Sequence, residues 1–395
     1  MKFLLLFLGM AIVSTSEAKM FDIAKSAIET NIIKLQSGSF LSAGAHQFKS
    51  FWTRDFCFSS VGLLEIGRGD VVKNQLSYLI KNRRKDNLVP LYVDSMSPVS
   101  RVVAGTVFRA ARLNATLPMT DNIKPFYLVN NKFEAIDSNV MVLYASLAYY
   151  NYTKDLTWFN ENRAAFREIF DFYKSKMNDG LIQQNEHADW QDSAKRNGKT
   201  FFTNLLYYHM AKQYSFLSER DLVILRNKIV EVFYDKKVGL FRSIAGRNLI
   251  SLEGNLWAID HNLIADSDKL YQNLTHHPLF AKYSMPGFAT FPSYNPDDMY
   301  IQVKIVGLRE YHGNLFWSWL MAYSSKVAFK KNDQARFQNF YAQLERVLNR
   351  DRTVFEIYNN DAEKTPVTNY LYKAEAPFSW GAGFVLDLEG TIRRK

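Results

Sequence analysis

The stretch DLVILRNKIVEVFYDKK (residues 221–237) shows the pattern on which the fold prediction depends. Apolar residues return every three or four positions with charged residues between them, which is the spacing of a helix with one buried face. The apolar residues at these positions are Leu222, Leu225, Ile229, Val232 and Phe233. Such a helix is typical of an outer layer, with one side against a core and the other in water.

Working outward from this helix, other parts of the chain have the same character. Helical stretches include DSNVMVLYASLAYYNYT (137–153), NENRAAFREIFDFYKSKM (160–177), TNLLYYHMAKQYSFL (203–217) and DQARFQNFYAQLERVL (333–348). Some are amphipathic, and others are apolar on nearly every side, as expected for an inner layer. Alternation typical of strands is confined to short pieces such as GLFRSI (239–244).

The spacing of similar helix starts indicates how the helices are arranged. GNLWAIDHNLIAD begins at Gly254 and GNLFWSWLMAYSS at Gly313, 59 residues later, a spacing that suits one helical hairpin per unit. A proline-rich stretch at 277–298 is expected to be a long ordered loop between helices. We therefore predict an all-α fold, a single-domain (α/α)6 barrel of six hairpins, with a repeat solenoid as the alternative.

The first residues have the features of an export signal. Residues 1–18, MKFLLLFLGMAIVSTSEA, contain an early lysine, an apolar run and a Ser-Glu-Ala ending. The run is shorter than the roughly twenty residues that span a bilayer. We predict a cleavable signal peptide over 1–18, a catalytic domain over 19–395, no stable membrane anchor and a secreted or periplasmic location. A buried N-terminal helix is the alternative.

Composition limits the partners of the chain. The formal net charge is +10, and the basic residues are scattered in pairs along the sequence. This favours weak attraction to anionic envelope polymers, whereas nucleic-acid binding is not expected because no recognisable binding motif is present. The single cysteine, Cys57, excludes an internal disulfide framework, and its flanking phenylalanines predict a buried thiol.

Several cofactor motifs are imitated but not completed. NGKT (197–200) resembles the end of a phosphate-binding loop, but Ser193 stands where that motif requires glycine. GRGDVV (67–72) lacks the third glycine of a dinucleotide-binding turn. His187 and Asp189 have no third ligand at a telling spacing. We predict neither a cofactor nor a metal ion.

Acidic residues and tryptophans coincide instead. They meet in FWTRDFCF (51–58), HADWQDS (187–193) and NLWAID (255–260), and further tryptophans stand in YHGNLFWSW (311–319) and APFSWGAG (376–383). Aromatic rings stack on sugar rings, while Asp, Arg and His bind hydroxyl groups. Cleavage of a glycosidic bond also needs two carboxyl groups. The alternative is that the tryptophans only fill the core of a large helical domain.

Taken in chain order, these segments resemble the motifs of (α/α)6-barrel glycoside hydrolases of families 63 and 100. That group includes processing α-glucosidase, mannosylglycerate hydrolase and alkaline/neutral invertase, with trehalase and glycogen-debranching glucosidase more distant. The resemblance runs from about Trp52 to Leu386. It is carried by FWTRDFCFSSVGLLEIG (51–67), AIDSNVMVLYAS (135–146), DWQDSAKRNGKTFFTNLLYYHMAK (189–212), YHGNLFWSWL (311–320) and FEIYNNDAEKTPVTNYLYKAEAPFSWGAGFVL (355–386).

The resemblance implies two catalytic residues. Asp192 matches the second Asp of the Asp-Trp-x-Asp segment and would be the general acid, with Asp189 or a helix-cap role as alternatives. Glu356 would be the second carboxylate, acting as general base. Three other acidic residues are close to it in sequence: Asp361, Glu363 and Glu375. This pair predicts hydrolysis with inversion.

The same comparison implies residues that bind the substrate. Arg54 and Asp55 would bind sugar hydroxyls, and a buried ion pair that ties helices together is their alternative role. Trp52 and Trp380 are expected as stacking platforms. Further candidates are Asp189, Trp190, His312 and Trp317. For His312 and Trp317, plain packing is the alternative role.

The sequence thus predicts an exported inverting glycoside hydrolase. Its expected substrate is a small oligosaccharide or glycoside with an α-linked bond. Three other functions stay open: a catalytically inactive sugar-binding barrel, a lyase or epimerase on the same barrel, and a structural envelope protein.

Overall fold

The protein was analysed as a computed structural model, which describes residues 19–395 except 112, 114, 130–131 and 282–285. The predicted signal peptide, residues 1–18, therefore lies outside the described residues. No helix in the described part of the chain is long and apolar enough to cross a membrane.

Six helices form a closed inner ring. Each packs on the next in chain order, and the last packs back on the first. They are α2 (Thr53–Glu65), α5 (Asp137–Thr153), α8 (Phe201–Gln213), α10 (Leu252–Asp260), α14 (Ser318–Lys330) and α16 (Ser379–Arg393). Because they have neighbours on all sides, most of their residues are buried, which explains why their sequences are apolar nearly all round.

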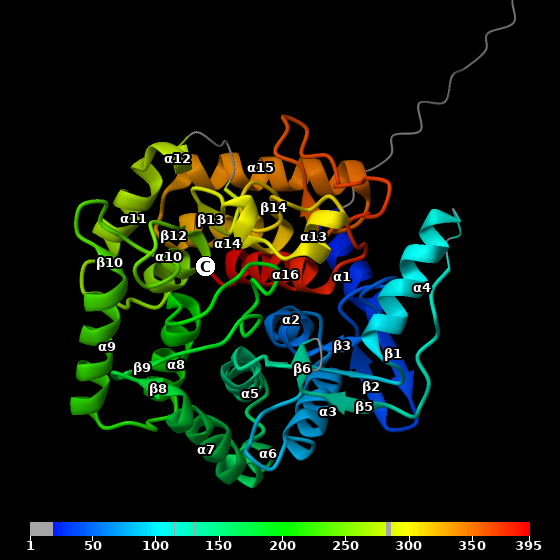
Figure 1. The fold of residues 1–395 in the computed structure, drawn as a ribbon, viewed down its shortest axis with the longest axis horizontal. Helices are drawn as coiled ribbons and strands as arrows, with labels where there is room; N and C mark the ends of the chain where they lie inside the picture. The colour runs from blue at the N-terminus through cyan, green and yellow to red at the C-terminus, as the bar shows by residue number, and fades with distance from the viewer. Residues whose placement is uncertain (1–18, 112, 114, 130–131, 282–285) are drawn as a thin grey trace, which may run out of the picture.

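An outer layer of helices covers this ring. The helix predicted at 221–237 is α9 (Glu219–Phe233), which packs on α8 through Leu222, Leu225, Ile229 and Phe233. Figure 1 shows α7, α9, α11 and α15 along the rim of the molecule. The other outer helices are α1 (Met20–Asn31) on α16, α3 (Gly69–Lys81) on α2 and α5, α7 (Arg163–Asp171) on α5, α11 (Ser267–His276) on α10 and α15 (Gln334–Asp351) on α14. The predicted all-α (α/α)6 barrel is confirmed.

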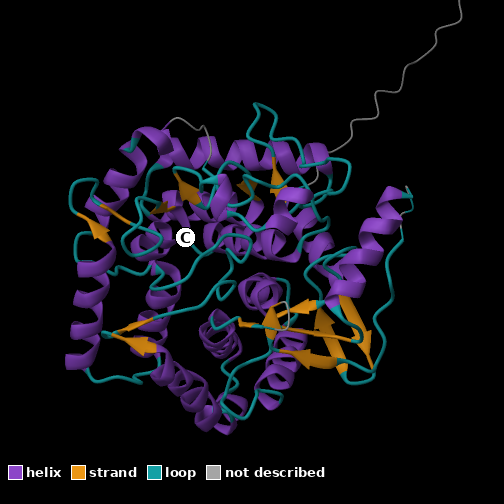
Figure 2. Cartoon of the chain, viewed as in Figure 1, coloured by secondary structure: helices purple, strands orange, loops and turns teal. Residues whose placement is uncertain are grey.

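The strands are short antiparallel pieces that connect helices, as Figure 2 shows. The predicted strand in GLFRSI is β11 (Leu240–Phe241), paired with β10 (Tyr234–Asp235). Three strands run directly into inner helices: β3 (Phe51–Trp52), β12 (Ile250–Ser251) and β14 (Phe316–Trp317). Their partners are β4 (Tyr92–Asp94), which also pairs β5 (Lys124–Phe126), then β13 (Thr290–Phe291) and β15 (Ile357–Tyr358).

The remaining elements lie in the connections. They are the pairs β1 (Ile32–Leu35) with β2 (Gly38–Leu41), β6 (Leu128–Val129) with β7 (Phe133–Glu134), and β8 (Met177–Asn178) with β9 (Leu181–Ile182). The other helices are α4 (Pro98–Ala110) and the short α6 (Leu156–Glu161), α12 (Pro278–Ala281) and α13 (Ile301–Ile305), with 3₁₀ turns at Phe172–Lys176 and Pro296–Asp298.

Two expectations about the chain need correction. The stretch 277–298 is not one loop, because it contains α12, β13 and a 3₁₀ turn, while 282–285 lie outside the described residues. The two GNL segments are also not equivalent helix starts. Gly254 is inside the first turn of α10, whereas Gly313 lies in a turn, its N–H bonded to the Glu310 carbonyl, before β14 and α14.

The seam between α2 and α16 is unusually close. A Cβ atom on Gly62 would lie 2.6 Å from the Gly383 Cα, and one on Gly383 would lie 2.5 Å from the Ser59 Cα. These are backbone contacts, so a side chain cannot move out of the way. The first and last inner helices therefore meet where neither has a side chain.

Candidate active site

A pocket of about 180 Å³ lies at one end of the barrel. Eight of the ten predicted site residues line it: Trp52, Arg54, Asp55, Trp190, Asp192, Trp317, Glu356 and Trp380. Residues that the sequence did not single out complete the lining: Ala43, Phe48, Ser193, Tyr311 and Phe378. Segments more than 300 residues apart in the chain thus meet in one place.

The architecture explains why these residues meet. Arg54 and Asp55 lie in the first turn of α2, Trp317 directly precedes α14, and Trp380 is the second residue of α16. Asp192 lies in the loop before α8. Because the inner helices deliver these residues at their N-terminal ends, the pocket faces the positive ends of the helix dipoles, which favour negative charge.

Arg54 holds two carboxylates together. Its Nε donates to both oxygens of Asp137, at 3.0 and 2.9 Å, and its Nη1 donates to Asp192 Oδ2 at 2.7 Å. Arg54 is buried, whereas the Asp192 side chain is 33% exposed. The alternative role of Arg54, a buried ion pair that ties helices together, is therefore present in the structure, because Asp137 lies on the adjacent inner helix α5.

Glu356 is held by two tyrosines. The Tyr311 hydroxyl donates to Oε1 and the Tyr372 hydroxyl donates to Oε2, and Glu356 is only 2% exposed. Burial raises the pKa of Glu356 to about 7, although both tyrosine hydrogen bonds favour the ionised form. The arrangement orients the carboxylate, and its raised pKa makes the protonated form more favourable than in a free glutamate.

The other two pocket carboxyls differ in their partners. Burial, and next the Glu356 carboxylate, raise the pKa of Asp55 to about 8. No side chain among the described residues forms a hydrogen bond with the Asp55 carboxyl. Burial also raises the pKa of Asp192, and the Arg54 guanidinium opposes this shift. In both residues, burial favours the protonated carboxyl group.

Aromatic rings form the walls and the floor. Trp190 makes edge-on contacts with Trp317 and Trp380, with ring centroids 5.4 and 5.7 Å apart. Phe58 stacks on Trp380 at 5.0 Å, on the side of the barrel core. Trp52 is partly exposed and packs on Tyr92 at 4.8 Å. Such flat apolar surfaces beside carboxyl groups fit a sugar ring.

Two predicted substrate-binding residues do not line the pocket. Asp189 is 1% exposed and forms an ion pair with Arg196, its Oδ2 lying 2.9 Å from Nη2. His312 is fully buried, stacked on Trp317 at 5.5 Å and edge-on to Trp190 at 5.3 Å. Direct contact of these two side chains with a substrate is therefore not supported, because other side chains surround them.

The structure adds residues that the sequence did not single out. Tyr311 and Tyr372 bind Glu356, and Asp137 binds Arg54. All three stand in quoted motif segments: Tyr311 directly precedes His312, Tyr372 belongs to the closing segment and Asp137 opens α5. The motifs therefore indicate the correct segments, but a motif alone does not show which of its side chains points into the site. In the described residues, no group of three or more His, Cys, Asp or Glu residues is placed to hold a metal ion.

Known structures share this fold. No protein-family model and no curated protein matches the sequence. A rhamnosidase from Klebsiella oxytoca with rhamnose bound is 11% identical, with a TM-score of 0.64 over 93% of this chain and 62% of its own. A GH63 mannosylglycerate hydrolase from Thermus thermophilus, in complex with Tris, is 10% identical, with a TM-score of 0.63 over 93% of this chain and 99% of its own.

A third solved structure is a GH78 family rhamnosidase from a Bacillus species, 12% identical, with a TM-score of 0.63 over 94% of this chain. The chain spans 34% of that enzyme and 62% of the Klebsiella rhamnosidase, less than two thirds of either, but nearly all of the mannosylglycerate hydrolase. At these identities the likeness concerns the fold. The chain has the (α/α)6-barrel fold of these glycoside hydrolases.

Proposed function

We propose that this protein is a glycoside hydrolase that removes a terminal sugar from a small oligosaccharide or glycoside with inversion of configuration. One observation carries the proposal: eight residues chosen from sequence motifs line a single pocket, in which three carboxyl groups lie among four tryptophans. The barrel fold that the chain shares with known glycosidases supports it.

Asp192 is the proposed general acid and Glu356 the proposed general base. Asp192 gives its proton to the leaving oxygen as the glycosidic bond breaks. Glu356 takes a proton from a water molecule whose oxygen bonds to the anomeric carbon from the opposite face. This mechanism expects the two carboxyl groups roughly 6.5–9.5 Å apart, with room for that water.

The surroundings of the carboxyls fit these roles. Glu356, with a pKa of about 7 and two tyrosine donors, can act as a base near neutral pH. Burial favours a proton on Asp192 despite the Arg54 guanidinium. Asp55, with a pKa of about 8, would carry a proton and donate a hydrogen bond to a sugar hydroxyl.

Pocket size supports action at the end of a sugar chain. The volume of about 180 Å³ is below the roughly 300–1,000 Å³ of pockets that hold drug-sized ligands, so it suits a single ring. Trp52 and Trp380 would stack on that ring. Solved structures in complex with glucose include a mannosylglycerate hydrolase and a glycosidase variant, so glucosides are the first substrates to test.

Export completes the proposal. The signal-like residues 1–18 support a secreted or periplasmic enzyme. N-terminal sequencing of the protein recovered from a culture fraction tests this: a mature start at Lys19 is expected. A start at Met1 in the cell interior would overturn it.

Proton NMR of the purified mature protein tests the hydrolase itself. The substrates are α-linked di- and oligosaccharides together with sucrose and trehalose, and Asp192→Asn and Glu356→Gln proteins serve as comparisons. Release of a sugar whose first-formed anomer is inverted, lost in both variants, is expected. Sugar-dependent thermal stabilisation without turnover would instead identify a binding protein. Turnover that survives both substitutions would mean that other residues catalyse the reaction.

A further inference from the structure

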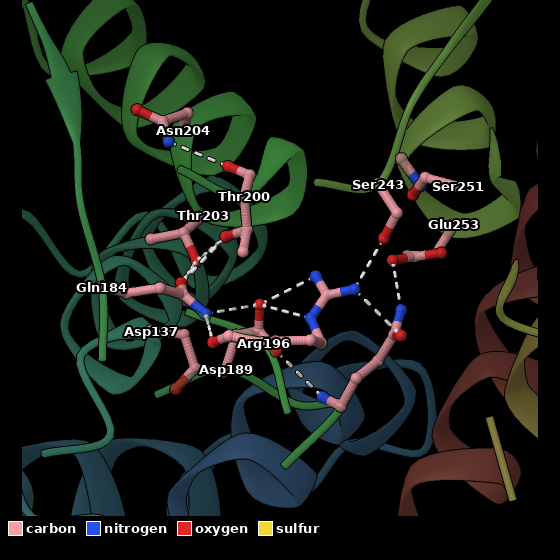
Figure 3. Close-up of polar contacts among 12 residues, drawn as sticks. Asp137, Gln184, Asp189, Arg196, Thr200, Thr203, Asn204, Ser243, Ser251 and Glu253 are labelled. Atoms are coloured by element: carbon pink, nitrogen blue, oxygen red, sulfur yellow. Dashed lines mark hydrogen bonds and ion pairs between the residues drawn. The ribbon is translucent and has the colours of Figure 1, made fainter. Parts of the chain in front are cut away.

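The side chain of Arg196 forms hydrogen bonds with the loop that carries Asp192, the proposed general acid. Arg196 is 1% exposed. Its Nε and Nη2 donate to Asp189 Oδ2 at 3.1 and 2.9 Å, and its Nη1 donates to Gln191 Oε1 at 3.0 Å. Figure 3 shows Arg196 beside Asp189. Asp189 and Gln191 flank Trp190, so one guanidinium holds both neighbours of a pocket wall.

The same guanidinium is anchored to other parts of the barrel. Nη1 also lies 2.6 Å from Ser243 Oγ and 2.6 Å from Tyr294 Oη. Gln191, in turn, accepts from the Tyr294 hydroxyl at 2.6 Å and donates through Nε2 to Glu253 Oε1, in the first turn of α10, at 2.7 Å. The loop of residues 189–192 is therefore hydrogen-bonded, directly or through Arg196, to three separate segments, which contain Ser243, Glu253 and Tyr294.

Asp189 is held from a further side. Gln184 Nε2 donates to Asp189 Oδ2 at 2.9 Å, while Gln184 Oε1 accepts from the Thr200 and Thr203 hydroxyls around the start of α8 (Figure 3). The other oxygen of Asp189 accepts the Gln191 backbone N–H at 3.1 Å. Both carboxylate oxygens are thus in use, which leaves Asp189 no free oxygen for a substrate.

We propose that Arg196 is a positioning residue that fixes Trp190 and Asp192 in the pocket. A buried guanidinium and carboxylate cannot separate without leaving charges unpaired in a dry interior, so residues 189–192 move only at high cost. Asp192 then meets Arg54 at 2.7 Å, and Trp190 forms the wall. The catalytic consequence rests on the proposed hydrolase function, but the control of loop position does not.

A simple stabilising ion pair is the competing explanation. It predicts that loss of Arg196 lowers stability as any broken buried pair does, without a specific effect on the loop. A matched control is Lys326 on α14, whose Nζ lies 2.6 Å from Asp387 Oδ2 on α16. Lys326→Met also leaves a buried carboxylate without its cation, but far from residues 189–192.

Hydrogen–deuterium exchange followed by mass spectrometry tests the positioning directly. In Arg196→Met, the amides of residues 188–194 should exchange at least about tenfold faster than in the wild type, and in Lys326→Met they should stay unchanged. Equal exchange of this loop in wild type and Arg196→Met would overturn the proposal. If Arg196→Met does not fold, Arg196→Lys and Tyr294→Phe take its place, each with a smaller increase, and unchanged exchange in both would overturn it.

Kinetics then test the catalytic consequence with the substrate found by NMR. Arg196→Met should lower kcat about tenfold or more with KM changed less than about threefold, and Arg196→Lys should recover part of kcat. Lys326→Met should keep kcat within about twofold. Equal losses of kcat in Arg196→Met and Lys326→Met would show that Arg196 only stabilises the fold. A wild type without turnover would overturn the hydrolase function instead, while the exchange experiment would still decide the positioning.

Discussion

The two ends of the barrel treat buried charge in opposite ways. At the pocket end, Asp137 and Asp192 share the single guanidinium of Arg54, and Asp55 and Glu356 have no cation among the described residues. Further along the inner helices, buried acids have lysine partners: Asp260, the last residue of α10, pairs with Lys330, and Asp387, in the middle of α16, pairs with Lys326.

The difference appears in the acid strengths. Burial alone would raise the pKa of Asp260, but the ammonium groups of Lys326 and Lys330 hold it at about 2. Burial, and next the Glu356 carboxylate, raise the pKa of Asp55 to about 8. Residues of one chemical type on one scaffold thus differ because of their partners. The far end pairs its buried acids with cations, whereas the pocket end leaves acids with raised pKa values, a feature that is common at functional sites.

The largest effect is expected from removing the proposed base. Glu356→Gln should lower kcat by about 10²–10⁴-fold, because a neutral amide cannot take the proton from water. Steady-state kinetics on the substrate found by NMR measure this, with Lys326→Met as the far-end control that keeps its activity. Nearly normal turnover by Glu356→Gln would show that the two ends do not differ in function.

Stability should depend most on the far end. Lys326→Met should lower the free energy of unfolding by about 3–5 kcal/mol, because Asp387 stays buried without its cation. The double variant Lys326→Met/Asp387→Leu should recover most of that loss. Urea denaturation at pH 7 measures both variants. A single variant as stable as the wild type would show that the far-end pairs contribute nothing.

The pocket end should make the protein less stable as pH rises. Glu356, with a pKa of about 7 when folded, keeps its proton between pH 5 and 7, where the unfolded chain has already lost it. The folded state therefore binds more protons, and stability falls with increasing pH. Glu356→Gln should gain about 1–3 kcal/mol at pH 8 and nothing near pH 4. Urea denaturation of the wild type and Glu356→Gln between pH 4 and pH 8 measures this. The same difference in free energy of unfolding at every pH would contradict the assigned role of Glu356.

The smallest effect concerns a single hydrogen bond. Tyr372→Phe removes a donor that favours ionised Glu356, so the pKa of Glu356 should rise and the acidic limb of kcat/KM should move up by about 0.5–1 pH unit. Tyr323→Phe is the matched control, because its hydroxyl donates to Asp260 Oδ2 at 3.2 Å at the far end. Equal pH profiles for all three proteins would contradict the assigned role of Tyr372.

Much of the fold could be predicted from the sequence because its signals are local. Helix α5 begins and ends at the predicted residues, 137 and 153, since an apolar run of that length has few other solutions. The helix predicted at 160–177 is not continuous in the structure. There the chain breaks into α6, α7 and a 3₁₀ turn, because Asn162 ends one short helix and begins the next. Such breaks depend on packing between helices rather than on periodicity.

The site was predictable at the level of segments but not of side chains. The motifs located the stretches around Asp192 and Glu356 correctly in one pocket, because a sugar site needs acids and aromatic rings together and several short segments supply both. They could not tell that Asp189 points to Arg196 or that Tyr311, rather than His312, reaches Glu356. Neighbouring residues in a loop point in different directions, and only the three-dimensional path of the backbone decides which one faces the pocket.

The glycine seam between α2 and α16 bears on the order in which the barrel assembles. Its two glycines, Gly62 and Gly383, are 321 positions apart, so the ring cannot close until residues 379–393 have been synthesised. Until then α2 and α14 each lack a neighbour, and a nascent chain exposes apolar helix edges. A contact of such long range makes folding slow. Alanine at Gly383 would place a Cβ 2.5 Å from the Ser59 Cα, so it should hinder this last docking step and weaken the closed ring.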